Sequence, residues 1–373
     1  MALKLIGQNS LHGHGKTMQV MNYKEYLYVG NMVSGIGTII VDVSNPSLPR
    51  VCGEMPAYKN SLCSKVQIVD ELMIINYECR TGEPAERLGF SIYSLKDPKN
   101  PREVAYYHVG GQGVHRTWYS GEEPYLFVTA VPEGFSDRML LIMDIKDPAH
   151  PREAGRWWYP GLWTAGGEEP NQPQGLKYKL HHAMVHKDRA YLGMWDAGMY
   201  ILDISQISNP QVAGSINWGP ERGGHTHTGL PLPRRNLLVV TDEAKGLPGE
   251  ESLKAVRILD IKDDKNPRVL SEFSVEHEDY GRYGPRFGPH NLHENRPGSW
   301  QSDEIIFVTW FGGGLRVVDI SDPCRPKEID RLIPPPAAGM PPTQINDVFV
   351  GQNGLIYLTD RAGSGMMIAE FTG

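Results

Sequence analysis

Several features that define large protein classes are missing from this sequence. It has four cysteines in 373 residues, which is too few for a fold held together by disulfides. No apolar run approaches the length needed to cross a membrane, and the first residues lack the long apolar core and cleavage site of a secretory signal. These absences predict a cytoplasmic protein without membrane contact, in which the thiols are free.

Basic runs and nucleotide-binding motifs are also missing. The net charge is −7, and no cluster of Lys and Arg predicts a nucleic-acid partner. There is no phosphate-binding Gly-rich loop, no dinucleotide fingerprint and no Gly-x-Ser-x-Gly elbow. We therefore expect no nucleotide cofactor. The expected partner is a small-molecule substrate, and homodimer formation is left open.

What the sequence does contain is a repeated turn. In residues 319–326, which follow an apolar run, an Asp is followed by a turn, and a Pro precedes the next strand. Further copies begin at Asp42, Asp144, Asp203 and Asp260, with a degraded copy at Ser94. Asp bonds to its own backbone and Pro fixes φ, so each copy predicts a tight turn between strands. Such a period must be interpreted before any other pattern because it determines the fold.

Seven short apolar runs rich in β-branched and aromatic residues accompany the turns. They are residues 26–29, 72–75, 125–128, 191–194, 237–240, 305–308 and 355–358. Each predicts the second strand of a four-stranded repeat, and no helical period competes. The seven runs have only six complete turns, because the last repeat ends at 365–371 after its third strand. Residues 2–7 have no partner strands of their own, so we predict that they form the missing outer strand and close a ring.

The predicted architecture is an all-β, seven-bladed β-propeller that forms a single domain over residues 1–373. The blades are expected at approximately 15–57, 61–108, 114–158, 180–218, 225–275, 289–333 and 344–373, the last with strand 2–7. Long loop insertions are expected at 157–178 and 276–289.

The sequence of the third strand and its turn, Leu315 to Pro323, resembles the repeats of the LVIVD-repeat proteins, which are β-propellers or are expected to be. This resemblance extends over nearly the whole chain and implies the propeller architecture. It implies little about activity, because propellers host many functions.

Histidines recur at one position of the repeat. In a propeller, the start of the innermost strand lies at the mouth of the central channel, and four adjacent blades have a His there: His115, His182, His227 and His290. Converging imidazoles must be mostly neutral, because like charges repel, and neutral imidazoles are ligands for a divalent transition metal. We predict one ion of iron, copper, manganese or zinc. The alternative is that each His bonds within its own blade.

Neighbouring residues widen the set of candidates. His181, His225 and His293 lie one to three residues from the predicted ligands, and a one-residue change of register would turn a different ring inward. As a catalytic base we predict Asp347, which occupies the histidine-equivalent position of its blade, or His225 or His293. Carboxylates at the ends of second strands are candidates for orienting the rings or for acid/base catalysis: Glu78, Asp196, Asp242, Glu243 and Asp360.

The two insertions are rich in aromatic residues. Long loops in a compact fold are usually functional, and aromatic loops over a metal predict a lid above a small apolar or aromatic substrate. The predicted substrate pocket consists of Trp163, Trp195, Tyr283, Trp310 and Arg361. Packing between blades is the alternative.

Together, these patterns predict a metal-dependent oxidoreductase with one His-ligated metal. The histidine arrangement is similar to those of the selenium-binding protein/methanethiol oxidase family, which binds copper, the carotenoid-cleaving oxygenases, which bind iron, and the oligogalacturonate lyases, which bind manganese. Two of these three families are redox enzymes, and four neutral nitrogen ligands suit iron or copper. A lyase or hydrolase that uses the metal as a Lewis acid is one alternative, and a non-enzymatic scaffold is another.

Overall fold

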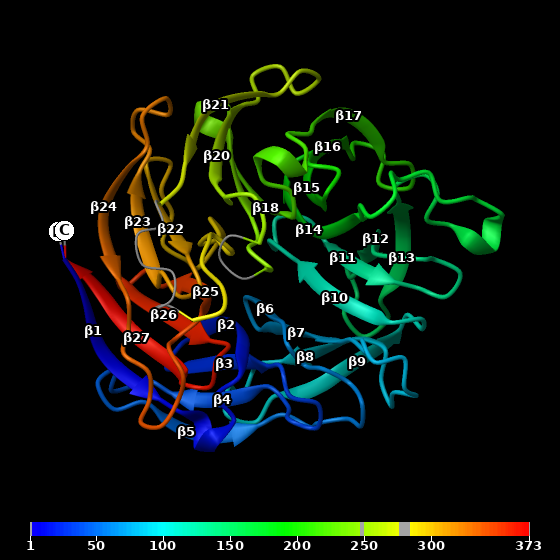
Figure 1. Ribbon diagram of the computed structural model, residues 1–373. Helices are drawn as coiled ribbons and strands as arrows, with labels where there is room; N and C mark the ends of the chain where they lie inside the picture. The colour runs from blue at the N-terminus through cyan, green and yellow to red at the C-terminus, as the bar shows by residue number, and fades with distance from the viewer. Residues whose placement is uncertain (1, 247–249, 276–283, 373) are drawn as a thin grey trace.

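The computed structural model describes residues 2–246, 250–275 and 284–372. In this structure the chain consists of short antiparallel strands arranged in a ring (Figure 1). Within the described ranges, helical structure is limited to four short 3₁₀ turns: η1 (Leu11–Gly13), η2 (Thr164–Gly166), η3 (Pro220–Arg222) and η4 (Pro233–Arg235). The same ranges contain no helix with the length and apolarity needed to span a membrane.

Three four-stranded sheets form the first part of the ring, each with its strands in chain order. The first contains β2 (Thr17–Tyr23), β3 (Tyr26–Asn31), β4 (Ile39–Asp42) and β5 (Arg50–Glu54). The second contains β6 (Val66–Val69), β7 (Leu72–Tyr77), β8 (Gly89–Ser94) and β9 (Arg102–His108). The third contains β10 (Gly113–Trp118), β11 (Tyr125–Val131), β12 (Met139–Asp144) and β13 (Arg152–Trp157).

An eight-stranded sheet follows, in which a single residue pair, Trp195 with Thr226, joins two four-stranded units. The first unit contains β14 (Tyr178–His186), β15 (Arg189–Trp195), β16 (Met199–Asp203) and β17 (Gln211–Ile216). The second contains β18 (Thr226–Leu232), β19 (Leu237–Asp242), β20 (Val256–Asp260) and β21 (Arg268–Phe273).

The last two sheets complete the ring. One contains β22 (Ile305–Thr309), β23 (Leu315–Asp319) and β24 (Lys327–Leu332), and on its inner side Leu292 forms a single bridge to Val308. The other contains β25 (Ile345–Val350), β26 (Leu355–Asp360) and β27 (Gly365–Thr372), together with β1 (Ala2–Asn9). The prediction of an all-β propeller is confirmed.

The N-terminal strand closes the ring, as predicted. β1 pairs antiparallel with β27, with Leu3 opposite Phe371 and Leu5 opposite Ala369. In Figure 1 the blue β1 lies beside the red β27. The pairing covers an edge of β27 that would otherwise be open to other chains.

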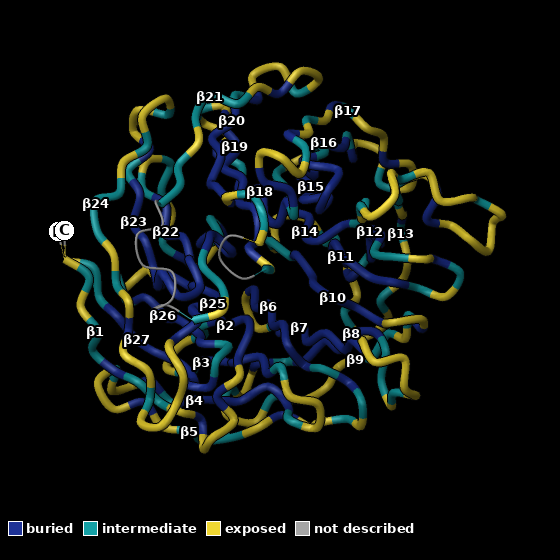
Figure 2. The backbone as a smooth tube through the Cα atoms, viewed as in Figure 1, coloured by how far each residue is buried: buried dark blue, intermediate teal, exposed yellow. Residues whose placement is uncertain are grey.

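The repeated turns form as the sequence predicts. An Asp Oδ1 accepts a hydrogen bond from the backbone N–H two residues later at Asp42, Asp144 and Asp319, at 2.8–2.9 Å. Burial follows the distance from the ring centre: inner strands are mostly buried, whereas outer strands and turns are exposed (Figure 2). Inner strands are covered on both faces, which is why their sequences are nearly continuous apolar runs.

Candidate metal centre

Four histidines and two glutamates meet at one face of the ring centre. His115, His181 and His227 lie near the starts of the inner strands β10, β14 and β18, whereas Glu78 and Glu243 directly follow the second strands β7 and β19. An inner strand starts at this face and the next strand returns to it, so the two sets of side chains converge. We call this the histidine face.

The rings of His115, His181, His227 and His290 form a continuous, buried chain. The Nε2 atoms of His115 and His181 are 3.0 Å apart, and the ring centroids are 3.7 Å apart for His181 and His227 and 4.2 Å apart for His227 and His290. None of the four residues is more than 4% exposed. One donor atom each from His181, His227 and Glu243 lie within 4.8 Å of one another.

Each Nδ1 atom in this cluster is next to a hydrogen-bond acceptor. The partners are Glu78 carboxylate for His115 (3.1 Å), His227 carbonyl for His181 (3.2 Å), Thr228 hydroxyl for His227 (2.9 Å) and Asn346 carbonyl for His290 (2.6 Å). The carbonyls of His227 and Asn346 only accept, so the proton of His181 and that of His290 belong on Nδ1 and their Nε2 lone pairs stay free. The Thr228 hydroxyl can donate or accept, and Arg80 Nη2 also lies 3.2 Å from His115 Nδ1. Such partners orient metal-binding histidines in known sites.

Three Nε2 atoms of the cluster lack a suitable hydrogen-bond partner in the described part of the chain. The Nε2 atom of His227 has no hydrogen-bond partner among the described residues, although it is buried. The Nε2 atoms of His115 and His181 face each other at 3.0 Å, and two lone pairs at that distance repel unless a cation or proton lies between them. A metal ion bound to these atoms would satisfy both conditions.

Three of the distances between donor atoms fit a metal ion. Two ligands about 2.1 Å from one metal are about 3.0–3.4 Å apart when adjacent and up to about 4.2 Å apart when opposite. The 3.0 Å contact between His115 and His181 falls in the first range. Both His227 Nε2 and His290 Nε2 lie 3.9 Å from a carboxylate oxygen of Glu243, within the upper limit.

Burial keeps the four rings neutral. It lowers the pKa of each ring well below its ordinary value, and nearby cations and histidines act in the same direction. Arg116 is among the cations that lower the pKa of both His181 and His227. Neutral imidazole is the form that binds a metal.

The two glutamates stay ionised although they are buried. Burial alone would raise the pKa of Glu243, but His290, Lys245, Arg286 and Arg361 outweigh it and lower the pKa to about 2. Arg286 Nη1 donates to Glu243 Oε1 at 2.9 Å. At Glu78, burial is likewise outweighed by His115, Arg80 and Arg138, so its pKa lies well below the ordinary value.

The structure places His181 in the cluster where the sequence predicted His182. The His182 ring lies 5.9 Å from Trp118, and neither of its nitrogens has a partner among the described residues. Adjacent strand residues point to opposite sides. The register shifts alike in β10, β14 and β18, just before Arg116, His182 and Thr228. His181 is therefore the residue equivalent to His115 and His227. The predicted ligand His182 is therefore replaced by His181.

The three predicted bases have different surroundings. Asp347 is buried and accepts a hydrogen bond from the N–H of Val20 at 3.1 Å. His225 borders the cluster: its Nδ1 donates to the Glu243 carbonyl at 3.2 Å. His293 bonds within its own blade, where Nδ1 accepts from the N–H of Phe307 and Nε2 donates to Asn295, each at 3.1 Å. Of the three, only His225 touches a member of the cluster in these contacts.

Two of the predicted pocket residues lie at the site. The ring of Trp195 stacks on His225 with centroids 4.7 Å apart and lies 5.9 Å from His181. Arg361 Nη1 is 4.0 Å from Glu243 Oε1. Tyr283 lies outside the described residues.

The other two aromatic residues are placed elsewhere. Trp310 is buried in a hydrophobic cluster beside Phe273, and it is its neighbour Phe311 that contacts His290, with centroids 4.7 Å apart. Trp163 packs on Phe135 and Trp158, in a loop that projects from the rim of the ring between β13 and β14 (Figure 1). This loop is not positioned as a lid over the centre.

Sequence reasoning missed most of the cations. Arg138, Lys245 and Arg286 surround Glu78 and Glu243, yet all three lie in loops between strands. A position in a loop carries no periodic signal, so only the folded ring brings them together.

Comparison with known proteins supports the fold. The LVIVD repeat model matches residues 14–55, 125–158, 184–217 and 302–332. Among solved structures, U3-55K is 8% identical with a TM-score of 0.64, and the alignment covers 99% of this chain and 98% of the U3-55K chain. The WD40 repeats of RRP9 are 7% identical with a TM-score of 0.63, covering 100% and 98%. Sqt1 of Saccharomyces cerevisiae is 9% identical with a TM-score of 0.54, covering 94% and 82%.

Such low identities show the fold alone. A search of curated proteins found no match, and the comparisons give no support to the resemblance of the histidines to the selenium-binding protein/methanethiol oxidase family. The chain is thus a β-propeller that contains LVIVD repeats and is similar in fold to WD40 proteins.

Proposed function

We propose that this protein is a metal-dependent enzyme with one divalent transition metal at the histidine face. His181, His227 and Glu243 are the central ligands, and His115 and His290 complete the set. The observation that carries the proposal is the convergence of the four buried rings: carbonyl acceptors at the Nδ1 atoms of His181 and His290 leave their Nε2 lone pairs free, and His227 Nε2 is buried without a partner among the described residues.

The donor set favours redox chemistry. The three central ligands, two histidines and one carboxylate, are the ligand types of many non-haem iron oxygenases, so we propose an oxidoreductase. The same set holds zinc in some hydrolases, which supports the second candidate, a lyase or hydrolase. When bound, the metal would supply redox or Lewis-acid chemistry according to its identity.

The cations around the site favour a substrate with an anionic group. Arg80 and Arg138 lie around Glu78, and Lys245, Arg286 and Arg361 lie around Glu243, so five cations face two carboxylates. Burial lowers the pKa of Arg361 to about 10, and repulsion from Arg286 acts in the same direction. A negatively charged substrate would relieve this repulsion, and Trp195 offers an apolar wall for the rest of the molecule.

The chain's own residues would hold this centre in place. Glu78 fixes His115 through Nδ1 and is itself held by Arg80, whose Nε donates to it at 2.8 Å. Arg286 holds Glu243 in the same way. His225 is close enough to exchange a proton with a substrate near Trp195, and so remains the candidate base.

Metal analysis of the purified protein tests the proposal. We would measure elemental content in protein prepared without an affinity tag, together with His181→Ala and His227→Ala. His186→Ala is the control, because His186 ends the same strand, β14, far from the cluster. We expect about one metal ion per chain in the parent and the control, and a loss of at least about 10-fold in affinity in the two ligand variants.

The identity of the metal then separates the two candidate reactions. Iron or copper supports oxidation, whereas zinc or manganese supports the lyase or hydrolase. If the parent binds none of these four metals after incubation with each, the proposal is wrong and the ring is a binding scaffold.

A further inference from the structure

A second group of buried charges lies deeper in the ring, beyond the histidine cluster. It consists of Lys65, Arg116 and Arg296, each 1% exposed, and we call it the buried cation group. Lys65 and Arg116 both act on the pKa of His227, so the group lies next to the cluster. None of its members is a proposed metal ligand.

One carboxylate and one indole connect the group. Glu294 accepts from Arg116 Nη2 at 3.0 Å and pairs with Arg296 Nη2 at 2.7 Å. The guanidinium of Arg296 lies 4.6 Å from the ring centroid of Trp118. The His182 ring contacts the same indole, so His182, which lies outside the metal cluster, belongs to this group.

Several polar atoms here have no partner. The unpaired atoms are Arg116 Nε, Arg296 Nε and Nη1, and both nitrogens of His182, all buried and without a hydrogen-bond partner among the described residues. Leaving a charged donor unpaired in the interior is unfavourable. An acceptor among these atoms would remove that cost.

The charges of the group do not balance. Burial lowers the pKa of Lys65 to about 7 and raises that of Asp347 to about 7, and each acts on the other. If both are ionised, three cations face two carboxylates. If both are neutral, the two arginines face Glu294 alone. The sum is one positive charge in either case.

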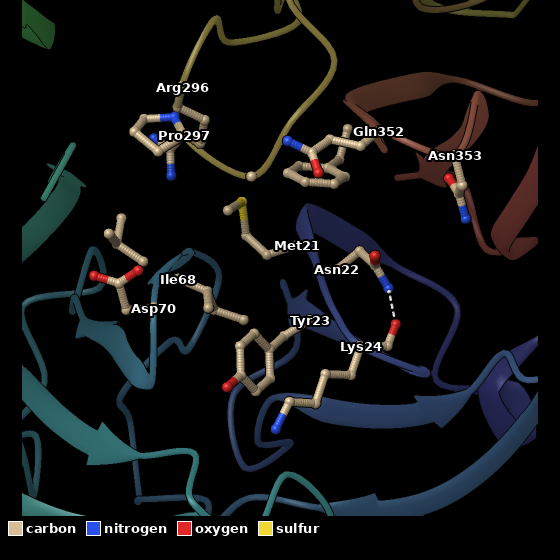
Figure 3. Close-up of a pocket in the computed structure, with 13 residues that line it drawn as sticks. Met21, Asn22, Tyr23, Lys24, Ile68, Asp70, Arg296, Pro297, Gln352 and Asn353 are labelled. Atoms are coloured by element: carbon tan, nitrogen blue, oxygen red, sulfur yellow. Dashed lines mark hydrogen bonds between the residues drawn. The ribbon is translucent and has the colours of Figure 1, made fainter.

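A surface hollow leads to this group from the other side of the ring. It has a volume of about 400 Å³ and is lined by Arg296 together with Met21, Ile68 and Phe349, as Figure 3 shows for the first three. Met21 and Ile68 lie toward the ends of the inner strands β2 and β6, opposite to the histidine face. Arg296 thus connects the hollow with the interior.

We propose that the buried cation group is a binding site for a small monovalent anion, of the size of a halide or formate. Arg116, Arg296 and His182 donate to the anion, and Lys65 adds charge. The anion enters from the hollow beside Arg296, so the site is filled independently of the metal centre. Charge-assisted hydrogen bonds from two guanidinium groups are the usual means of holding such an anion.

Thermal unfolding in bromide tests the site. We would compare the full-length protein in sodium bromide and in sodium gluconate at equal ionic strength, which removes general screening from the comparison. Because a ligand of the folded state stabilises it, bromide at about 100 times its dissociation constant should raise the unfolding midpoint by about 3 °C. The rise should saturate, and it should be the same in chelator-treated protein.

Two variants and a crystal assign the effect to the site. Arg296→Met and Arg116→Met each remove the excess charge in either protonation state and should abolish the bromide-specific rise, and either one suffices if the other fails to fold. Arg234→Gln is the control, because Arg234 is a surface arginine paired with Asp303. Anomalous scattering from a bromide-soaked crystal should show a peak between Arg116, Arg296 and His182. Equal midpoints in the two salts, or no peak at that place, would overturn the proposal; neither result depends on whether the protein binds a metal.

Discussion

His181 and His182 show how far sequence alone can resolve a site. Both are buried in β14 and adjacent in sequence, yet one joins the histidine cluster and the other contacts the indole of Trp118. The repeat predicts histidines at the starts of inner strands, because that prediction depends only on the period. The choice between neighbours depends on a shift of register that recurs just before Arg116, His182 and Thr228, and an alignment of the strands that leaves out this shift selects the wrong ring.

A different histidine gives a prediction at the same scale. Burial lowers the pKa of His293 to about 4, and its Nδ1 lone pair already accepts the N–H of Phe307. Between pH 6.5 and 4 the unfolded chain binds a proton that the folded chain does not, so the free energy of unfolding falls as the pH falls through this window. In His293→Asn, whose Oδ1 can still accept from Phe307, this loss should disappear.

Urea unfolding at pH 7 and pH 5 measures the effect. Between these two pH values the parent should lose about 2 kcal/mol more stability than His293→Asn, because about 1.5 pH units of the window, from 6.5 to 5, are crossed at about 1.36 kcal/mol per unit. The comparison cancels the contributions of the other buried histidines, which both proteins share. Equal losses would show that His293 is not held neutral by the fold.

At the scale of elements, the closing strand could be predicted and the aromatic loop could not. Seven second strands with six complete turns require an outside strand, because an open sheet edge is unfavourable. β1 supplies it. The aromatic insertion at 157–178 carried no comparable constraint, since tryptophans fit a lid and a packed rim equally well. In the structure Trp158 donates to Glu168 at 3.0 Å, and the loop packs on itself.

Removal of β1 should therefore open the ring. Deleting residues 2–9 leaves the edge of β27 unpaired and removes Leu3 and Leu5 from the apolar cluster that they cover. We expect the thermal midpoint to fall by about 5 °C or more and the protein to associate through the free edge, which light scattering would detect. A peptide of residues 2–9, added in excess, should reverse both effects.

A milder change provides the control for this deletion. Lys4→Gln removes only the exposed ion pair of Lys4 with Glu370, whose atoms are 3.8 Å apart. Exposed pairs contribute about 0–1 kcal/mol, so the variant should behave as the parent does. A deletion variant that stays monomeric and equally stable would mean that the last sheet is complete without β1.

At the scale of the whole molecule, the fold could be predicted because the turn and strand pattern repeats along the chain. The site could be predicted only in part, because it is assembled from single residues of different repeats. Each copy of the turn supports the same prediction, so one degraded copy does not change the predicted fold. Glu243 and Glu78 could be identified as candidates from their place after second strands, whereas the loop cations had no such marker. The closed ring is what brings residues from 78 to 361 of the chain to one place.

This long-range assembly couples metal binding to the stability of the entire ring. His115, His181, His227 and His290 come from four successive repeats, so a metal bound by them connects those repeats and cannot bind equally well to the unfolded chain. Metal at about 100 times its dissociation constant should add about 2.7 kcal/mol to the free energy of unfolding. Calorimetry of chelator-treated protein, with and without the metal found by elemental analysis, measures this difference. Glu243→Gln should reduce the gain, because it removes the charged ligand, and His186→Ala should preserve it. If chelation leaves the midpoint of the parent unchanged, the histidine cluster does not hold a metal in the folded protein.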